Sequence, residues 1–152
     1  MADATISFSL GPNETKETMF SFMPREFGFF AAGLTSEQRL QTVKDSFHPD
    51  ITWFDFDGSV LRGHDALFKR AELLLGQLPS GSVHRLRGEA STSQNIVTQK
   101  WDAVPAGTEN DFDQVPMIEG RDIVLVEDHQ IKILWTCVDH IDEKLGSDIG
   151  KV

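Results

Sequence analysis

The sequence predicts an α+β domain in which helices near the N-terminus pack on one face of a largely antiparallel sheet. A chain of 152 residues is the right length for one domain with one core. Helical patterns fill its first half and long strand patterns fill its second half, an order typical of α+β domains. Short connections between the strand patterns favour antiparallel neighbours.

Three segments have the spacing and end signals of helices. The first runs from Pro24, which suits the first turn of a helix, to residue 33, a glycine that suits the end of one. The second begins after Thr35, which forms a capping-box pattern with Gln38, and it ends before the His48-Pro49 pair. The third covers residues 64–78, has one apolar face and stops at a Pro-Ser-Gly sequence.

Strand-forming residues dominate the remaining segments. Residues 51–56 and 60–61 flank an Asp-Gly pair that favours a hairpin turn. Four longer strand patterns follow at 83–91, 96–104, 117–126 and 131–139. Residues 1–16 lack periodicity. The predicted organisation is therefore a flexible arm (1–16), one domain (17–145) and a C-terminal tail (146–152).

The composition of the chain argues against several classes of binding partner. The formal net charge is −10, and a surface this acidic repels nucleic-acid backbones and anionic lipids, so we expect neither partner. The first ten residues do not have the pattern of a signal peptide, and no apolar run is long enough for a membrane span, so we expect a cytoplasmic protein. Cys137 is the one cysteine of the chain, which excludes an internal disulfide. We interpret it as a small buried residue.

Four segments, in their order and spacing, resemble the nuclear transport factor two-like superfamily. That group includes the SnoaL-like cyclases, ketosteroid isomerases, scytalone dehydratases and limonene epoxide hydrolases. The four segments are Phe47–Trp53, Gly63–Leu67, Gly120–Ile123 and Ile131–Asp139. The resemblance runs from about Phe20 to Asp142. It implies a cone-shaped, curved antiparallel or mixed sheet packed on about three N-terminal helices, around a pocket that holds a small apolar molecule.

Within that group, the nearest functional resemblance is to limonene epoxide hydrolase. The Lys100-Trp101-Asp102 sequence stands at the position of that family's Arg-x-Asp, and Asp139 stands at the position of its second aspartate. Trp53 and Asp55 fall on the water-holding Tyr and Asn of the family, so three of the five positions carry a different residue type.

The two aspartates are the strongest catalytic candidates. Alternation along a strand puts Lys100 and Asp102 on one face, and it puts Asp139 on the same face as Trp135 in the last strand. If both carboxylates enter one pocket, their repulsion raises one pKa and places an acid beside a base. The alternatives are a solvated strand end for Asp139, and either an ion-pair role or simple surface exposure for Lys100.

Other side chains are candidates for the pocket wall. Trp53 and Trp135 either line the pocket or pack in the core. His84, in mid-strand, is either a general base or a structural histidine, and Asp55 is either a ligand-binding residue or a turn residue. The histidines do not have metal-ligand spacing, so we expect no metal, and no cofactor motif is present.

The leading hypothesis is a cofactor-independent acid–base enzyme that acts on a small apolar molecule as an isomerase, a cyclase or an epoxide-hydrolase-like enzyme. Asp139 would be the base and Asp102 the acid, tuned by Lys100. The alternatives are a non-catalytic carrier or ligand-binding protein of the same fold, and a dimerisation module. We also expect a homodimer, because the last strand is apolar on both faces and one of them needs cover.

Overall fold

The structure is a computed structural model that describes residues 14–145 and 149–151. Within these ranges the chain forms helices α1 (Lys16–Phe27), α2 (Ser36–Ser46) and α3 (Gly63–Gln77) and a six-stranded sheet, with 3₁₀ turns at Gly28–Phe30 and Glu143–Leu145. The strands are β1 (Phe47–Phe54), β2 (Val60–Arg62), β3 (Val83–Ser93), β4 (Ile96–Val104), β5 (Ile118–Glu127) and β6 (Gln130–Ile141). The predicted α+β class is confirmed.

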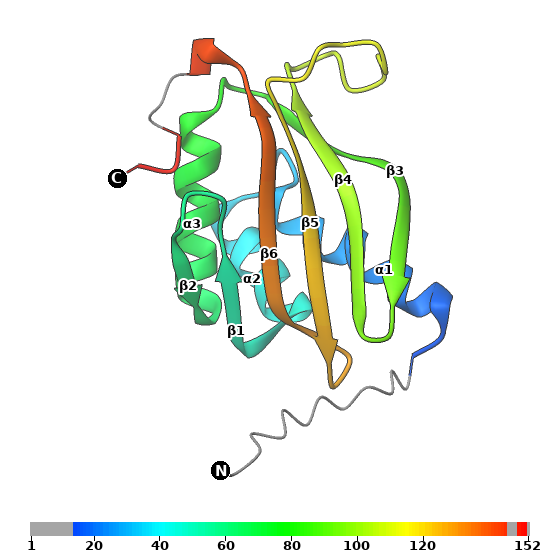
Figure 1. The fold of residues 1–152 in the computed structure, drawn as a ribbon. Helices are drawn as coiled ribbons and strands as arrows, with labels where there is room; N and C mark the ends of the chain where they lie inside the picture. Colours follow the sequence, from blue (N-terminus) through cyan, green and yellow to red (C-terminus); the bar gives the residue numbers. More distant parts are fainter. Residues whose placement is uncertain (1–13, 146–148, 152) are drawn as a thin grey trace, which may run out of the picture.

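The sheet is mixed and strongly curved, and the helices cover one of its faces (Figure 1). The strand order is β2-β1-β6-β5-β4-β3; β1 runs parallel to β6, and the other neighbours are antiparallel. Helix α3 packs on β1, while α1 packs on β3 and β4. The helices and the sheet enclose the core, and the pocket described below lies in this same space.

The helix ends follow the predicted chemistry for α2 and not for α1. In α2, the Gln38 backbone N–H donates to Thr35 Oγ1 at 3.1 Å and the Thr35 N–H donates to Gln38 Oε1 at 2.9 Å, which completes the capping box. Helix α1 begins at Lys16 instead of Pro24, which lies inside it. Its buried residues, Met19, Phe22, Met23 and Glu26, recur at helical spacing. The prediction began too late because it took Pro24 as the first turn of the helix.

One extra residue in β6 reverses the predicted orientation of its side chains. Ile131 and Ile133 pair with two successive residues of β5, which leaves Lys132 as a bulge. Ile131 and Leu134 are therefore both fully buried on the helix side. A shift of one residue sends the side chains that follow to the opposite face, as far as a second irregularity at Asp139.

This reversal corrects three predictions. Trp135 does not enter the pocket; it lies on the face turned away from the helices, where its ring stacks on Phe54 at a centroid distance of 6.1 Å. Cys137, predicted to be buried, is exposed. Asp139 is exposed as well, so its predicted place inside a pocket is wrong.

Candidate active site

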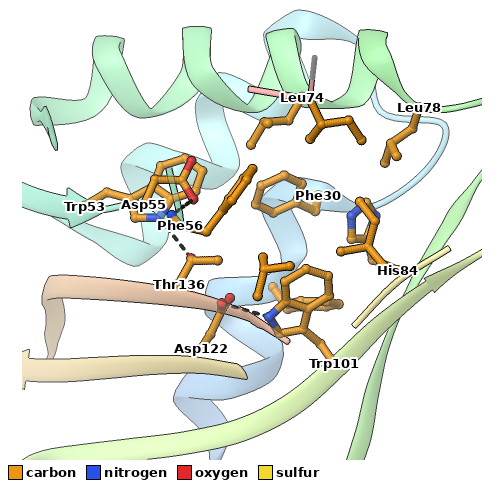
Figure 2. Close-up of a pocket in the computed structure, with 14 residues that line it drawn as sticks. Phe30, Trp53, Asp55, Phe56, Leu74, Leu78, His84, Trp101, Asp122 and Thr136 are labelled. Atoms are coloured by element: carbon orange, nitrogen blue, oxygen red, sulfur yellow. Dashed lines mark hydrogen bonds between the residues drawn. The ribbon is translucent and has the colours of Figure 1, made fainter. Parts of the chain in front are cut away.

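A pocket lies between the helices and the inner face of the sheet (Figure 2). Its cavity volume is about 50 Å³, and the empty space within it, with the open mouth included, is about 490 Å³. Its wall is mainly aromatic and aliphatic, with a few polar groups. The lining residues are Phe27, Phe30, Trp53, Asp55, Phe56, Leu74, Leu78, His84, Trp101, Ile118, Asp122, Thr136, Val138 and Ile149.

Asp122, on β5, is the pocket carboxyl that the sequence prediction missed. It is 3% exposed, and its Oδ1 accepts a hydrogen bond of 2.9 Å from Trp101 Nε1 on β4 (Figure 2). Burial raises the pKa of Asp122 to about 6, although hydrogen bonds with Glu26, Thr136 and Trp101 counteract part of this rise. The group can therefore both accept and release a proton near neutral pH.

Gly120 makes room for the indole that holds Asp122. A Cβ atom at position 120 would lie 2.9 Å from Trp101 Cζ2 and would also collide with the Cys137 carbonyl oxygen on β6. Because glycine has no Cβ, the Trp101 ring can lie close against β5 at position 120. From there its N–H reaches the carboxyl of Asp122, two residues further along the strand.

Trp53 and Thr136 form a second polar contact in the pocket wall. Trp53, on β1, is 1% exposed, and its Nε1 donates to Thr136 Oγ1 on β6 at 2.9 Å (Figure 2). Because the hydroxyl oxygen accepts this bond, its own proton remains available for the carboxyl of Asp122. Trp53 therefore lines the pocket, which is one of the two alternatives that the sequence left open for it.

Asp55 also faces the pocket, but its carboxylate is already paired. Arg70 Nε donates to Asp55 Oδ2 at 2.7 Å and the Phe56 backbone N–H donates to Oδ1 at 2.8 Å. Burial raises the pKa of Asp55, while these two hydrogen bonds act against the rise. The charge of Arg70 is also compensated by Asp57, which lies 3.0 Å from Nη2, although Nη2 makes no hydrogen bond with the described residues. Neither charge is free to act on a ligand.

The same arginine holds the end of the chain against the pocket. Arg70 Nη1 donates to the Gly150 carbonyl oxygen at 2.7 Å, and the Gly150 N–H donates to Gln77 Oε1 at 2.7 Å. These bonds place Ile149 in the pocket wall. A residue of the predicted C-terminal tail therefore contributes to the site.

His84, on β3, lies among aromatic rings at the other side of the pocket. Its ring centroid is 5.1 Å from that of Phe30 and 6.0 Å from that of Trp101, and its Nδ1 has no hydrogen-bond partner among the described residues. Burial lowers the pKa of His84 to about 4; Asp102 opposes this shift and Arg39 adds to it. The imidazole is therefore neutral at physiological pH and offers one donor and one acceptor nitrogen.

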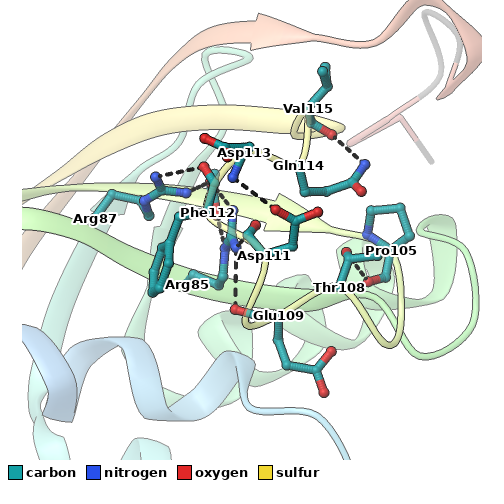
Figure 3. A network of polar contacts seen from close by, with 11 residues as sticks. Arg85, Arg87, Pro105, Thr108, Glu109, Asp111, Phe112, Asp113, Gln114 and Val115 are labelled. Atoms are coloured by element: carbon teal, nitrogen blue, oxygen red, sulfur yellow. Dashed lines mark hydrogen bonds and ion pairs between the residues drawn. The ribbon is translucent and has the colours of Figure 1, made fainter.

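Asp102 lies outside the pocket, on the opposite face of the sheet from Trp101, and this corrects its predicted role. Arg85 donates to its two oxygens at 2.9 and 2.8 Å, and Arg87 donates to Oδ2 at 2.8 Å. Arg85 Nη1 also donates to the carbonyl oxygens of Glu109 and Asp111, so the cluster holds down the β4–β5 loop (Figure 3). This is an ion-pair network that stabilises the loop.

Lys100 is exposed and is not the partner of Asp102. Two residues on one strand are separated by nearly 7 Å, whereas Arg85 lies directly opposite Asp102 on β3, at the closest cross-strand position. With Asp139 exposed as well, the predicted pair of Asp102 and Asp139 does not meet in the pocket. The resemblance of these positions to limonene epoxide hydrolase therefore has no structural support here.

Among residues 14–145 and 149–151, no group of three or more His, Cys, Asp or Glu side chains is arranged to hold a metal ion. No helix in the same ranges is long and apolar enough to cross a membrane.

Comparison with known proteins finds relatives by structure only. No family model and no curated protein sequence matches the chain. A protein of Agrobacterium tumefaciens, provisionally assigned as an isomerase of the SnoaL-like family, matches with a TM-score of 0.70 at 14% identity, over 82% of this chain and 99% of that one. A provisional SnoaL-like polyketide cyclase of Jannaschia matches with a TM-score of 0.63 at 10% identity, over 85% and 92%.

A designed protein with a curved β-sheet matches as well, with a TM-score of 0.59 at 12% identity, over 83% of this chain and 88% of that one. A shared fold therefore does not by itself assign an activity, and the function has to be argued from the site. The chain has the cone-shaped α+β fold of the SnoaL-like, nuclear transport factor two-like proteins.

Proposed function

We propose that the protein is a cofactor-independent acid–base enzyme, an isomerase or cyclase, that acts on a small uncharged apolar molecule. The observation that carries this proposal is Asp122, a buried carboxyl that faces an apolar pocket without a cationic partner among the described residues. Its raised pKa of about 6 matches the requirement for moving a proton near neutral pH.

Asp122 supplies the acid–base group for a proton transfer that leaves the substrate at the same oxidation level. Its carboxylate takes a proton from a carbon next to a carbonyl group, and the electron pair of the broken C–H bond forms an enolate. In an isomerisation of a ketone that also carries a nearby C=C bond, the enolate is a conjugated dienolate, and Asp122 returns the proton to its far carbon. In a cyclisation, the enolate carbon attacks a second carbonyl and the proton goes to the new alkoxide. Neither reaction needs a further reactant.

The enolate oxygen requires a hydrogen-bond donor, and the pocket provides two. His84 is neutral and keeps one N–H, and the Thr136 hydroxyl can turn from Asp122 towards a ligand. Trp101 N–H is occupied by Asp122. Because the chain contains no tyrosine, a phenol donor is not available to this site.

The charges around the pocket favour an uncharged substrate. Arg70, the cation paired with the pocket residue Asp55, is also paired with Asp57 and bound to the backbone. A ligand carboxylate or phosphate would therefore enter a low-dielectric site without a free counter-charge, and it would face Asp122. The apolar lining instead favours rings and alkyl groups with one or two carbonyl or hydroxyl groups.

Hydrogen–deuterium exchange at carbon tests the proposal without knowledge of the natural substrate. A panel of uncharged, ring-containing ketones is incubated with the protein in D₂O, and deuterium next to the carbonyl is followed by mass spectrometry. We expect exchange with the wild type and a loss of roughly 100-fold or more with Asp122→Asn, the usual contribution of a general base. Asp139→Asn, which changes an exposed aspartate, is the matched control and should exchange normally.

The exchange assay also distinguishes an enzyme from a carrier. The largely apolar wall and the paired Asp55 are compatible with a carrier. A carrier would bind members of the panel, or retain a ligand in native mass spectrometry, without catalysing exchange. Equal exchange by the wild type and Asp122→Asn would contradict the proposed role of Asp122.

A further inference from the structure

Glu26, near the end of α1, has no place in the proposed reaction and is nevertheless completely buried. Both of its carboxylate oxygens are enclosed, and no N–H or O–H donor of the described residues reaches either of them. The group that Glu26 faces is another carboxyl, that of Asp122. An isolated, ionised carboxylate in such a position is far too costly to be retained.

Two facing carboxyls can form a hydrogen bond only if a proton lies between them. If both were ionised, they would repel one another in a region of low dielectric. If one is protonated, its O–H donates to the other, and the arrangement becomes favourable. The contact between Glu26 and Asp122 therefore requires at least one proton on the pair.

No other charged group near the pair changes this conclusion. On the Asp122 side, Trp101 and Thr136 are neutral donors from β4 and β6, and Asp55, whose charge also acts on Asp122, is bound to Arg70. His84 on β3 is uncharged near neutral pH.

Arg39 on α2 is committed elsewhere, because it pairs with Glu72 and binds the Phe29 carbonyl oxygen. Within the described part of the chain, then, the buried pair has no cation to balance a second negative charge.

We propose that Glu26 is a positioning residue that keeps its proton and donates it in a hydrogen bond to Asp122, so that the pair carries one negative charge and that charge lies on the carboxyl facing the pocket. Glu26 itself does not touch the substrate. The effect of Glu26 on turnover rests on the proposed function. The proton shared by Glu26 and Asp122 does not, because it is present without any substrate.

The pKa directions agree with this assignment. Burial and the nearby Asp122 raise the pKa of Glu26 well above its ordinary value. The hydrogen bond from Glu26 lowers the pKa of Asp122, which burial alone would push higher. Asp122 is therefore the first of the two to lose its proton as pH rises, and Glu26 remains the donor at neutral pH.

The test measures protonation directly, by NMR of side-chain carboxyl carbons labelled with ¹³C, in the wild type, Glu26→Gln and Glu26→Leu. Glutamine keeps the shape and an N–H donor but cannot titrate; leucine removes the donor. We expect Asp122 to titrate near the wild-type pH in Glu26→Gln. In Glu26→Leu we expect its titration to move upward by about one pH unit or more, as for a buried carboxyl without its donor.

The wild type supplies an independent result if Glu26→Leu does not fold. Its spectrum at neutral pH should contain a protonated glutamate signal that Glu26→Gln lacks. The proposal is overturned if the Glu26 carboxyl is ionised at neutral pH, or if the titration of Asp122 is the same in all three folded proteins.

The ketone exchange assay then shows whether the proton matters for turnover. The rise of the exchange rate with pH should move upward in Glu26→Leu and stay in place in Glu26→Gln; a profile that does not move in Glu26→Leu contradicts a positioning role. If no protein exchanges any ketone, the proposed function fails, while the NMR titrations still decide whether Glu26 holds the proton.

Discussion

Replacing Asp122 by asparagine should make the folded state more stable, and the gain should depend on pH. Folding buries the carboxyl and raises its pKa from an ordinary 3.8 to about 6. A raised pKa means that the folded state binds the proton more tightly than the unfolded state. The contribution of Asp122 to stability is therefore fully present below about pH 4 and is lost as pH rises through about 6.

The size of the stability change follows from the rise in the pKa of Asp122. About two pKa units at about 1.4 kcal/mol each correspond to about 3 kcal/mol that the wild type loses between pH 4 and pH 7. Asparagine is isosteric and uncharged, so it avoids this loss. Its carbonyl oxygen can still accept from Trp101, and its amide can donate to Glu26.

Urea denaturation of the wild type and Asp122→Asn, repeated from pH 4 to pH 8, measures the difference in the free energy of unfolding. We expect the variant to become more stable relative to the wild type as pH rises. The difference in the free energy of unfolding should approach about 3 kcal/mol at pH 7 and above. Asp139→Asn should stay within about 0.5 kcal/mol of the wild type throughout, as expected for an exposed site. The reasoning fails if the difference between Asp122→Asn and the wild type does not change with pH.

Three further predictions concern the surroundings of the pocket. Asp102→Ala should destabilise the protein by about 3–5 kcal/mol, because it leaves two arginines without their carboxylate, and amide hydrogen exchange in the 105–116 loop should increase; a normal melting curve would contradict the structural role. His84 should titrate near pH 4, so its proton NMR signals should not shift between pH 5.5 and 8, and its contribution to stability should be lost only as pH falls from about 6.5 towards 4. The homodimer remains a prediction, and the exposed Phe54 with the half-buried Trp135 stacked on it now indicates which sheet face it would use: light scattering should give a dimer for the wild type and a monomer for Trp135→Glu.

Local patterns were sufficient to predict the fold. The Thr35–Gln38 capping box, the strand pattern at 96–104 and the third helix each depend on neighbouring residues, and the structure has them at or within one residue of the predicted positions. Such patterns also capture the antiparallel pairs joined by short turns, β3 with β4 and β5 with β6, but not the parallel pairing of β1 with β6. The start of α1 was missed because Pro24 was interpreted as the first turn, whereas it lies inside a helix that begins at Lys16.

The site was harder to predict because it depends on which strand face points inward. β6 is apolar on both faces, so alternation alone could not orient it, and the bulge at Lys132 that decides the orientation has no signal in the sequence. Asp122 could have been found, since it alternates with Gly120 and Val124, and the buried positions of this strand follow that spacing from Ile118 to Val124. The two aspartates predicted as catalytic, Asp102 and Asp139, lie outside the pocket, whereas Asp122 and Asp55, the latter already a candidate for the wall, line it.

The central claim is that Asp122 moves the proton, and the pH dependence of ketone exchange tests it most directly. For the wild type, we predict that the exchange rate rises as Asp122 ionises, with a midpoint near pH 6, and levels off above it; Asp122→Asn should remain at the rate of the buffer at every pH. A wild-type profile without that midpoint, or an Asp122→Asn profile that follows the wild type, would contradict the account.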